Sequence, residues 1–189
     1  MIGGLYDMAR LVIYGFGQLE LNNAAFRRDG RVEAQCKLDP TGFSSIPAEN
    51  GMLLAVDKVN GLIKLPAQTE TLPIAINYSA EHLYDERAMG LKNFRLMKDD
   101  FLPRVGYLAV GDLFTTNCVS YDTAEWADDE AFIAAMKAVK TTPAFGTQST
   151  DGSIVVSATA PGAGTKLEVV KATTMPDGQF AVQFRVLVA

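Results

Sequence analysis

Histidine and cysteine are scarce in this 189-residue chain, which has one histidine, His82, and two cysteines, Cys36 and Cys118. These residues are scattered and form no Cys-x-x-Cys or related unit, so the sequence does not favour a structural zinc site. Hydrophobic residues make up 48% of the chain, which is enough to build a core without cross-links. We therefore expect both cysteines to be unpaired, buried thiols.

The chain also lacks an excess of positive charge and a long apolar run. Seventeen Lys and Arg residues against 22 Asp and Glu residues give a formal net charge of −5, which argues against nucleic acid or an anionic membrane as a partner. The longest uncharged run, residues 152–165, is rich in Ser, Ala, Thr and Gly and is too polar to cross a bilayer. No basic leader opens the sequence, so we expect no signal peptide.

Turn-forming dipeptides are the strongest organisational signal in the sequence. Asp-Gly and Asn-Gly pairs readily adopt the positive φ of tight turns, and five of them punctuate the chain at residues 29–30, 50–51, 60–61, 151–152 and 177–178. Short β-branched and aromatic runs flank them, as strands do. The runs that we predict to be strands are residues 31–38, 52–56, 62–65, 167–172 and 180–188.

One helix stands out, over residues 128–140. Acidic residues open it, Phe132, Met136 and Val139 form an apolar stripe, and Pro143 lies beyond its end. A shorter helical turn is predicted at residues 80–88. Helices do not alternate with the strands, so we expect a mainly β fold, α+β by count, with an antiparallel β-barrel or sandwich body.

The first 47 residues differ from the rest of the chain. Glycines interrupt them at positions 3, 4, 15 and 17, and few apolar residues lie between. We therefore expect two parts: an extended N-terminal arm, residues 1–47, which a neighbouring subunit holds in place, and a β-rich body, residues 48–189.

A possible catalytic triad is the first candidate site in the sequence. Ser79, His82 and Asp85 are the residue types of a hydrolase triad, but they crowd into seven positions and no nucleophile-elbow motif surrounds the serine. We therefore interpret them as a polar helical turn and keep a small hydrolase as an alternative. The sequence contains no phosphate-binding loop, dinucleotide fingerprint or calcium loop, so no cofactor or metal is predicted.

Aromatic residues leave a second alternative open. Trp126, Tyr121, Tyr107 and Tyr84 could stack on sugar rings, as in a carbohydrate-binding module. Aromatics make up an ordinary 9% of the chain, and such residues more often pack in a core.

Arg27, Arg28 and Arg31 form the one basic cluster that we single out. They flank the Asp29-Gly30 turn, and a hairpin tip that carries three arginines could contact a phosphate or an acidic partner. A solvated hairpin is the competing interpretation.

Four segments carry a resemblance to a known class of proteins. They are Glu49-Asn-Gly-Met-Leu-Leu-Ala-Val-Asp57, Asn60-Gly-Leu-Ile-Lys-Leu-Pro66, Leu72-Pro-Ile-Ala-Ile-Asn-Tyr-Ser79 and residues 105–117, which read as strand, Gly-Asp turn and strand. Together they resemble the head decoration, or cement, proteins of tailed bacteriophages, over about residues 48–120.

The resemblance implies a non-enzymatic virion structural protein, made in the host cytoplasm, that binds and stabilises a capsid lattice. Its implied partners are the major capsid protein and copies of itself, with no cofactor. The first 47 residues and the helix at 128–140 depart from the compact decoration proteins, so a tail or baseplate component stays open as an alternative.

Overall fold

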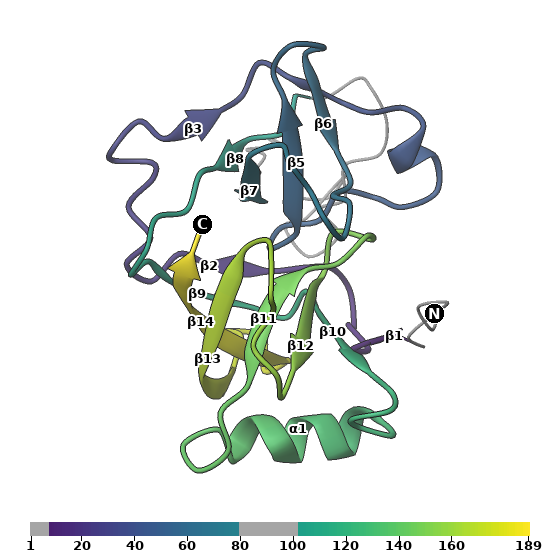
Figure 1. Cartoon of the computed structure of the whole chain (residues 1–189), viewed down its shortest axis with the longest axis vertical. Coiled ribbons are helices and arrows are strands. Elements are labelled where there is room, and N and C mark those ends of the chain that lie inside the picture. The colour runs from purple at the N-terminus through teal and green to yellow at the C-terminus, as the bar shows by residue number, and fades with distance from the viewer. Residues whose placement is uncertain (1–7, 80–101) are drawn as a thin grey trace.

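The computed structural model describes residues 8–79 and 102–189 and shows a mainly β fold (Figure 1). These residues form a sheet of eight strands, a sheet of six strands and one α-helix, α1, so the expected fold class is confirmed. The eight strands, in spatial order, are β1 (Met8–Arg10), β10 (Val119–Asp122), β12 (Ile154–Ser157), β11 (Phe145–Gln148), β13 (Lys166–Thr174), β14 (Phe180–Val188), β9 (Leu113–Thr116) and β2 (Leu19–Glu20). The six are β3 (Val32–Glu33), β8 (Val105–Gly106), β7 (Ile74–Asn77), β5 (Leu53–Asp57), β6 (Leu62–Lys64) and β4 (Lys37–Leu38).

Most neighbouring strands are antiparallel, as expected, but each sheet also contains one parallel pair. β10 runs parallel to β12, and β4 runs parallel to β6. In Figure 1 the six-stranded sheet forms the upper part of the molecule, the eight-stranded sheet lies below it, and α1 lies at the bottom. The two sheets are therefore mixed, and together they give a sandwich-like body.

Two of the predicted hairpins are confirmed. β13 and β14 pair along their whole length, and Gly178 in the turn between them has a φ of +87°. β5 and β6 pair across the 57–61 turn, where Gly61 has a φ of +67°. Glycine suits both positions because its missing Cβ removes the steric penalty of positive φ.

The strand predicted over residues 31–38 is instead split into two. β3 and β4 lie at opposite edges of the six-stranded sheet. Between them the Glu33 carboxylate accepts hydrogen bonds from the backbone N–H groups of Ala34 and Gln35, and such a side-chain turn replaces ladder pairing. The alternation in the sequence was correct for short stretches but could not reveal this turn.

The strand–turn–strand predicted over residues 105–117 also differs from a hairpin. Its first strand, β8, belongs to the six-stranded sheet and its second strand, β9, to the eight-stranded sheet. This segment therefore carries the chain from one sheet to the other.

The helix lies within the predicted range but ends earlier. α1 spans Asp129–Lys137, and the Asp128 side chain caps it by accepting a hydrogen bond from Ala131 N at 2.8 Å. Turns follow from residue 138 onward. The short helical turn predicted at residues 80–88 lies outside the described residues. A 3-10 helix, Gly42–Ser44, completes the helical elements of the part described.

The described part of the expected arm belongs to the body. Residues 8–47 contribute β1, β2, β3 and β4, which pair with strands from the later part of the chain. Phe26, Leu38 and Phe43 from this segment are fully buried. A few large side chains, set between glycines and turns, therefore fix residues 8–47 to both sheets, in contrast to the extended arm that we expected.

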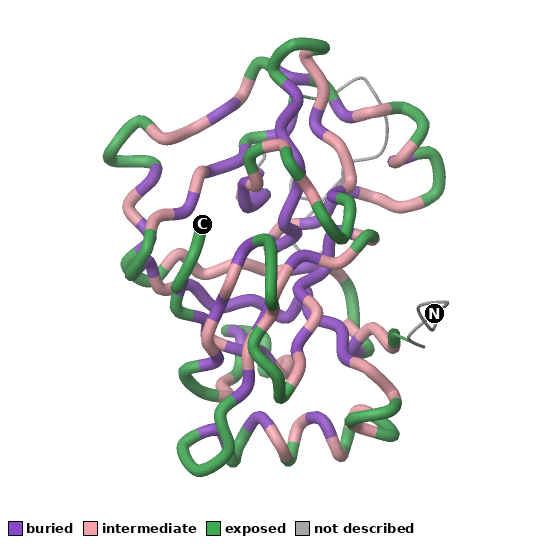
Figure 2. The backbone as a smooth tube through the Cα atoms, viewed as in Figure 1, coloured by how far each residue is buried: buried purple, intermediate pink, exposed green. Residues whose placement is uncertain are grey.

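The core extends from the helix through both sheets. Phe132 and Met136 of α1 share one hydrophobic cluster with Phe184 of β14, and Leu53 and Ile76 of the six-stranded sheet belong to the same cluster. A second cluster lies under the six-stranded sheet and the 36–48 segment. Figure 2 shows the buried segments along the centre of the body and the exposed ones at the turns.

Candidate functional site

The structure places Ser79 in an internal role. Its side chain is buried, and its Oγ donates to Asn77 Oδ1 at 2.7 Å and accepts from the backbone N–H of Arg104 at 2.8 Å. These bonds tie the end of β7 to the chain that enters β8. His82 and Asp85, the other two residues of the hypothetical triad, lie outside the described residues.

The aromatic residues considered for sugar binding pack against the helix. Tyr121 stacks on Phe132 with ring centroids 4.7 Å apart, and Trp126 meets the same ring edge-on at 5.5 Å. The Tyr121 hydroxyl donates to Asp129 Oδ1 at 2.6 Å. Burial, the main cause, and this bond, the second cause, raise the pKa of Tyr121 to about 12. Tyr107 lines a cavity described below, and Tyr84 lies outside the described residues.

Both cysteines are free and buried, which confirms the expectation that they are unpaired. Burial raises the pKa of the Cys118 thiol to about 12, so this group stays protonated at neutral pH. Within residues 8–79 and 102–189, no three His, Cys, Asp or Glu side chains are grouped so that they could hold a metal ion.

A partly buried ion pair lies beside Cys118. Arg10 Nη2 donates to Glu49 Oε2 and also approaches Cys118 Sγ at 3.5 Å. Burial alone would lower the pKa of Arg10. The interactions with Cys118, Glu49 and Asp151 outweigh this effect and raise the pKa above its ordinary value, so the guanidinium stays charged. These groups hold β1 against the loop before β5, which is a structural task.

The three arginines singled out from the sequence have different roles. Arg31 donates from Nη1 to the carbonyl of Tyr107 at 2.5 Å and pairs through Nη2 with Asp29 and Asp112 at 3.0 and 3.6 Å. The Arg27 guanidinium lies 5.9 Å from the ring centroid of Tyr78. Arg31 thus braces the fold, while Arg27 is exposed.

Arg28 differs from the other two arginines. It is exposed, and its side chain makes no hydrogen bond or ion pair with any other residue that the structure describes. Its backbone belongs to a helical turn rather than the predicted hairpin, because the N–H groups of Arg28 and Asp29 donate to the carbonyl of Ala25. We call residues 25–31 the arginine turn.

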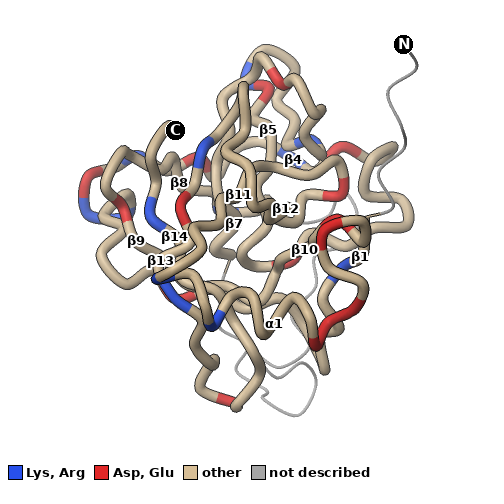
Figure 3. Tube along the Cα trace, turned by 60° about the horizontal axis from the view of Figure 1, so that its bottom comes forward, with Lys and Arg blue, Asp and Glu red and all other residues tan. Residues whose placement is uncertain are grey.

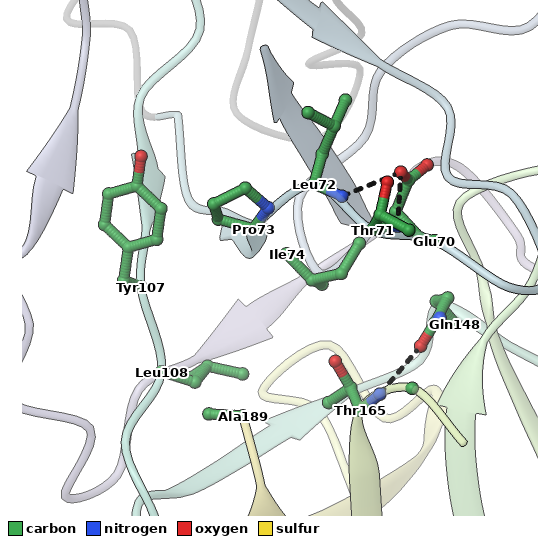
Figure 4. A pocket seen from close by; sticks show the side chains of 11 residues that line it. Glu70, Thr71, Leu72, Pro73, Ile74, Tyr107, Leu108, Gln148, Thr165 and Ala189 are labelled. Carbon is green, nitrogen blue, oxygen red and sulfur yellow. Dashed lines mark hydrogen bonds between the residues drawn. The ribbon is translucent and has the colours of Figure 1, made fainter. Parts of the chain in front are cut away.

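A cavity of about 480 Å³ opens between the two sheets (Figure 4). Two of its polar side chains are already hydrogen-bonded within the fold. Gln148 Oε1 accepts from the backbone N–H of Thr165 at 3.1 Å, and the Glu70 carboxylate accepts from three backbone N–H groups of residues 67–72. Burial alone would raise the pKa of Glu70, but these bonds hold it below its ordinary value. The residues that line the cavity are Glu70, Thr71, Leu72, Pro73, Ile74, Tyr107, Leu108, Gln148, Gly164, Thr165 and Ala189.

A second hollow, which we call the α1 groove, encloses about 650 Å³ beside the helix. The helix, the segment after β1 and the β13–β14 turn form its walls. Val12 and Tyr14 on the β1 side are exposed apolar residues, with 61% and 83% of their surface accessible. The residues that line the groove are Leu11, Val12, Tyr14, Asp129, Glu130, Ile133, Asp177, Gly178, Gln179 and Phe180.

Sequence reasoning missed the α1 groove, although a signal was present. Residues 11–14 are all apolar or aromatic, so whichever face turns inward, the other exposes apolar surface. In the structure Leu11 is buried while Val12 and Tyr14 face outward. A run that is apolar on both faces therefore predicts exposed apolar surface, which is the signal that the sequence carried.

Charge is separated along the helix. Figure 3 shows acidic residues at the N-terminal end of α1 and basic residues at its C-terminal end, next to β13. Asp128, Asp129 and Glu130 form the acidic end, and Lys137 and Lys140 lie at the other. The acidic residues at the N-terminal end and the lysines at the C-terminal end both stabilise the helix, because each interacts favourably with the helix dipole.

Comparisons of this chain with protein-family models, with curated proteins and with solved structures find no match. Among the described residues, no helix is long and apolar enough to cross a membrane.

Proposed function

We propose that this chain is a non-catalytic structural protein of a bacteriophage virion, which binds the major capsid protein on the head and stabilises the lattice. The observation that supports the proposal is the exposed apolar surface of Val12 and Tyr14 beside the α1 groove, which a contact within an assembly, with the capsid or with a second copy of the chain, would cover. Exposed apolar patches of this kind favour protein contacts. The resemblance of residues 48–120 to head decoration proteins supplies the kind of partner.

Hydrogen bonds between residues 16–18 and residues 116–117 are of the kind that a structural protein needs to resist mechanical stress. The Asn117 side chain accepts from the backbone N–H of Gln18 at 2.7 Å and donates to the carbonyl of Phe16 at 3.3 Å. Thr116 Oγ1 donates to the carbonyl of Gln18 at 2.7 Å. These bonds join residues about a hundred positions apart, so one segment cannot move without breaking contacts to the other.

The proposal is tested on purified particles of the phage that encodes the chain. Quantitative mass spectrometry is expected to find the chain at a fixed, high ratio to the major capsid protein. Particles stripped of the chain should lose their integrity at lower temperature, and added chain should restore it. A handful of copies per particle would instead support a tail or baseplate component, and absence from particles would overturn both assignments.

A further inference from the structure

The α1 groove has an acidic rim that no cation of the described residues neutralises. Asp129 and Asp177 are fixed by hydrogen bonds: Asp129 Oδ2 accepts from Val12 N at 3.1 Å, and Asp177 Oδ1 accepts from Gln179 N at 3.1 Å. The bonds from Gln179, above all the one from its side chain, lower the pKa of Asp177 and keep it charged. Glu130 is exposed and makes no hydrogen bond or ion pair within the part of the chain described.

The rest of the groove is mostly apolar. Leu11, Ile133 and Phe180 contribute to its lining, and the exposed ring of Tyr14 stands at its edge. An arginine side chain matches this combination, because its methylene stem packs on apolar surface while its planar guanidinium pairs with carboxylates and stacks on an aromatic ring. A lysine would gain less here, since its ammonium is more strongly hydrated and does not stack.

The chain carries such a group on another side of the molecule. The arginine turn lies between β2 and β3, on the left of Figure 1, whereas β1 and the N-terminal end of α1 lie on the right. Phe26 is fully buried beneath the turn, and Arg31 N donates to the carbonyl of Phe26 at 2.9 Å, so the turn is anchored to the body. Arg28 therefore projects from an anchored turn, and an ordered backbone reduces the entropy lost on binding.

We propose that the arginine turn of one copy docks into the α1 groove of a second copy, with Arg28 directed at Glu130. The two surfaces lie on different sides of the chain, so the contact is head-to-tail and each copy offers both halves of it. A contact of this type repeats into a ring or a filament. The inference names how the proposed structural protein would contact copies of itself, and it needs no capsid.

The test measures self-association by sedimentation velocity over a range of concentrations at low salt. The unmodified chain is expected to assemble with rising concentration. Arg28→Glu and Glu130→Arg should each weaken assembly about tenfold or more, because each places like charges together across the contact. Lys140→Glu changes the net charge as Arg28→Glu does but lies beyond the helix end, away from the groove lining, and is expected to leave assembly intact.

An equimolar mixture of the two variants gives the sharpest result. In the mixture the Arg28→Glu turn meets the Glu130→Arg groove with reversed charges, and the other contact is unmodified, so assembly should return. A chain that stays monomeric at every concentration, or a mixture that fails to assemble, overturns the inference. So does loss of assembly in Lys140→Glu alone, which would indicate antiparallel pairing of two helices. Binding to particles is scored separately, so failure here leaves the proposed function standing, and failure there leaves this contact standing.

Discussion

Arg10 and Glu49 form an ion pair that joins the edge of the eight-stranded sheet to the loop that enters the six-stranded sheet. Glu49 is anchored on the other side as well, because Asn77 Nδ2 of β7 donates to its carbonyl at 3.0 Å. Arg10 lies beside Cys118, in the connection between β9 and β10. One side-chain contact thus links three parts of the chain that are distant in sequence.

Removal of the cation from this pair should destabilise the fold. Arg10→Met removes this cation from the buried Glu49 carboxylate, and we expect the free energy of unfolding to fall by about 3 kcal/mol. Arg185→Met is the matched control, since the Arg185–Glu168 pair is more exposed and is expected to contribute less than about 1 kcal/mol. Denaturant unfolding measures both. Equal losses for the two variants would show that the Arg10–Glu49 pair is not a special fastening.

Residues 8–47 should be essential for folding. Phe26 packs against Tyr78 with ring centroids 4.9 Å apart, and a Cβ on Gly106 would lie only 2.2 Å from its ring. Phe26→Ala is therefore expected to cost about 3–5 kcal/mol, and deletion of residues 1–47 should leave an unfolded chain. Circular dichroism with thermal unfolding gives the measurement.

Gly106→Ala provides an independent check of the same contact. It adds a methyl group where the Phe26 ring already lies, so it should also destabilise the chain, through a clash rather than a cavity. If the chain that lacks residues 1–47 still unfolds cooperatively, at the same temperature as the unmodified chain, residues 8–47 form a separate arm.

Local patterns in the sequence predicted the helix and the strands of the β5–β6 and β13–β14 hairpins, but not β1, β2, β10, β11 or β12. The β13–β14 hairpin and α1 could be predicted because alternation, turn dipeptides and capping acids all act within a few residues. The split of residues 31–38 depends on the Glu33 carboxylate turning back on its own backbone, a choice that alternation does not encode. The integration of residues 8–47 depends on pairing with strands up to about 110 positions away.

The candidate sites show the same limit. The sequence identified Arg27, Arg28 and Arg31 as one basic cluster, but only long-range contacts separate Arg31, which braces Tyr107 and Asp112, from the exposed Arg28. The α1 groove combines three segments that are distant in sequence. Val12 N donates to Asp129, 117 positions away, and Tyr14 N donates to Gln179, 165 positions away. Such a surface exists only after folding, so no single stretch of the sequence contains its pattern.

The two thiols should react only when the chain unfolds. Cys36 and Cys118 are buried, and burial raises the pKa of both, so little thiolate forms at pH 8. We expect no reaction with a disulfide reagent over minutes in the native state and two thiols in denaturant without reductant. Ser45→Cys, at an exposed position, is the positive control and should react at once. Rapid reaction of the native chain would contradict the buried placement.

Acid should remove the contribution of Asp57. Its carboxylate accepts from Lys64 Nζ at 2.6 Å and from Asn60 Nδ2 at 2.7 Å, and these bonds lower its pKa. A group whose pKa is lower in the folded chain stabilises the fold above its unfolded pKa, and this contribution is lost as pH falls through the folded pKa.

Asp57→Asn tests the sign of this effect. The difference in free energy of unfolding between the unmodified chain and the variant should be constant from pH 7 to about pH 5 and shrink below about pH 4, near the ordinary pKa of an aspartate. Denaturant titrations at several pH values give the profile. A difference that stays constant down to pH 2 would rule out ionisation of Asp57 as its source.

Arg31 and Arg28 should separate stability from association. Arg31→Ala removes the donor to the Tyr107 carbonyl and the cation beside the buried Asp112, so we expect a loss of about 1–3 kcal/mol in the free energy of unfolding. Arg28→Ala removes an exposed side chain and is expected to change stability by less than about 0.5 kcal/mol while it weakens self-association. Arg31→Lys retains the charge but not the two-nitrogen geometry, so its stability should lie between that of Arg31→Ala and the unmodified chain. Chemical denaturation and sedimentation velocity on the same samples measure the two effects. If Arg28→Ala destabilises the chain as much as Arg31→Ala does, the arginine turn depends on both side chains and Arg28 is not free to bind a second copy.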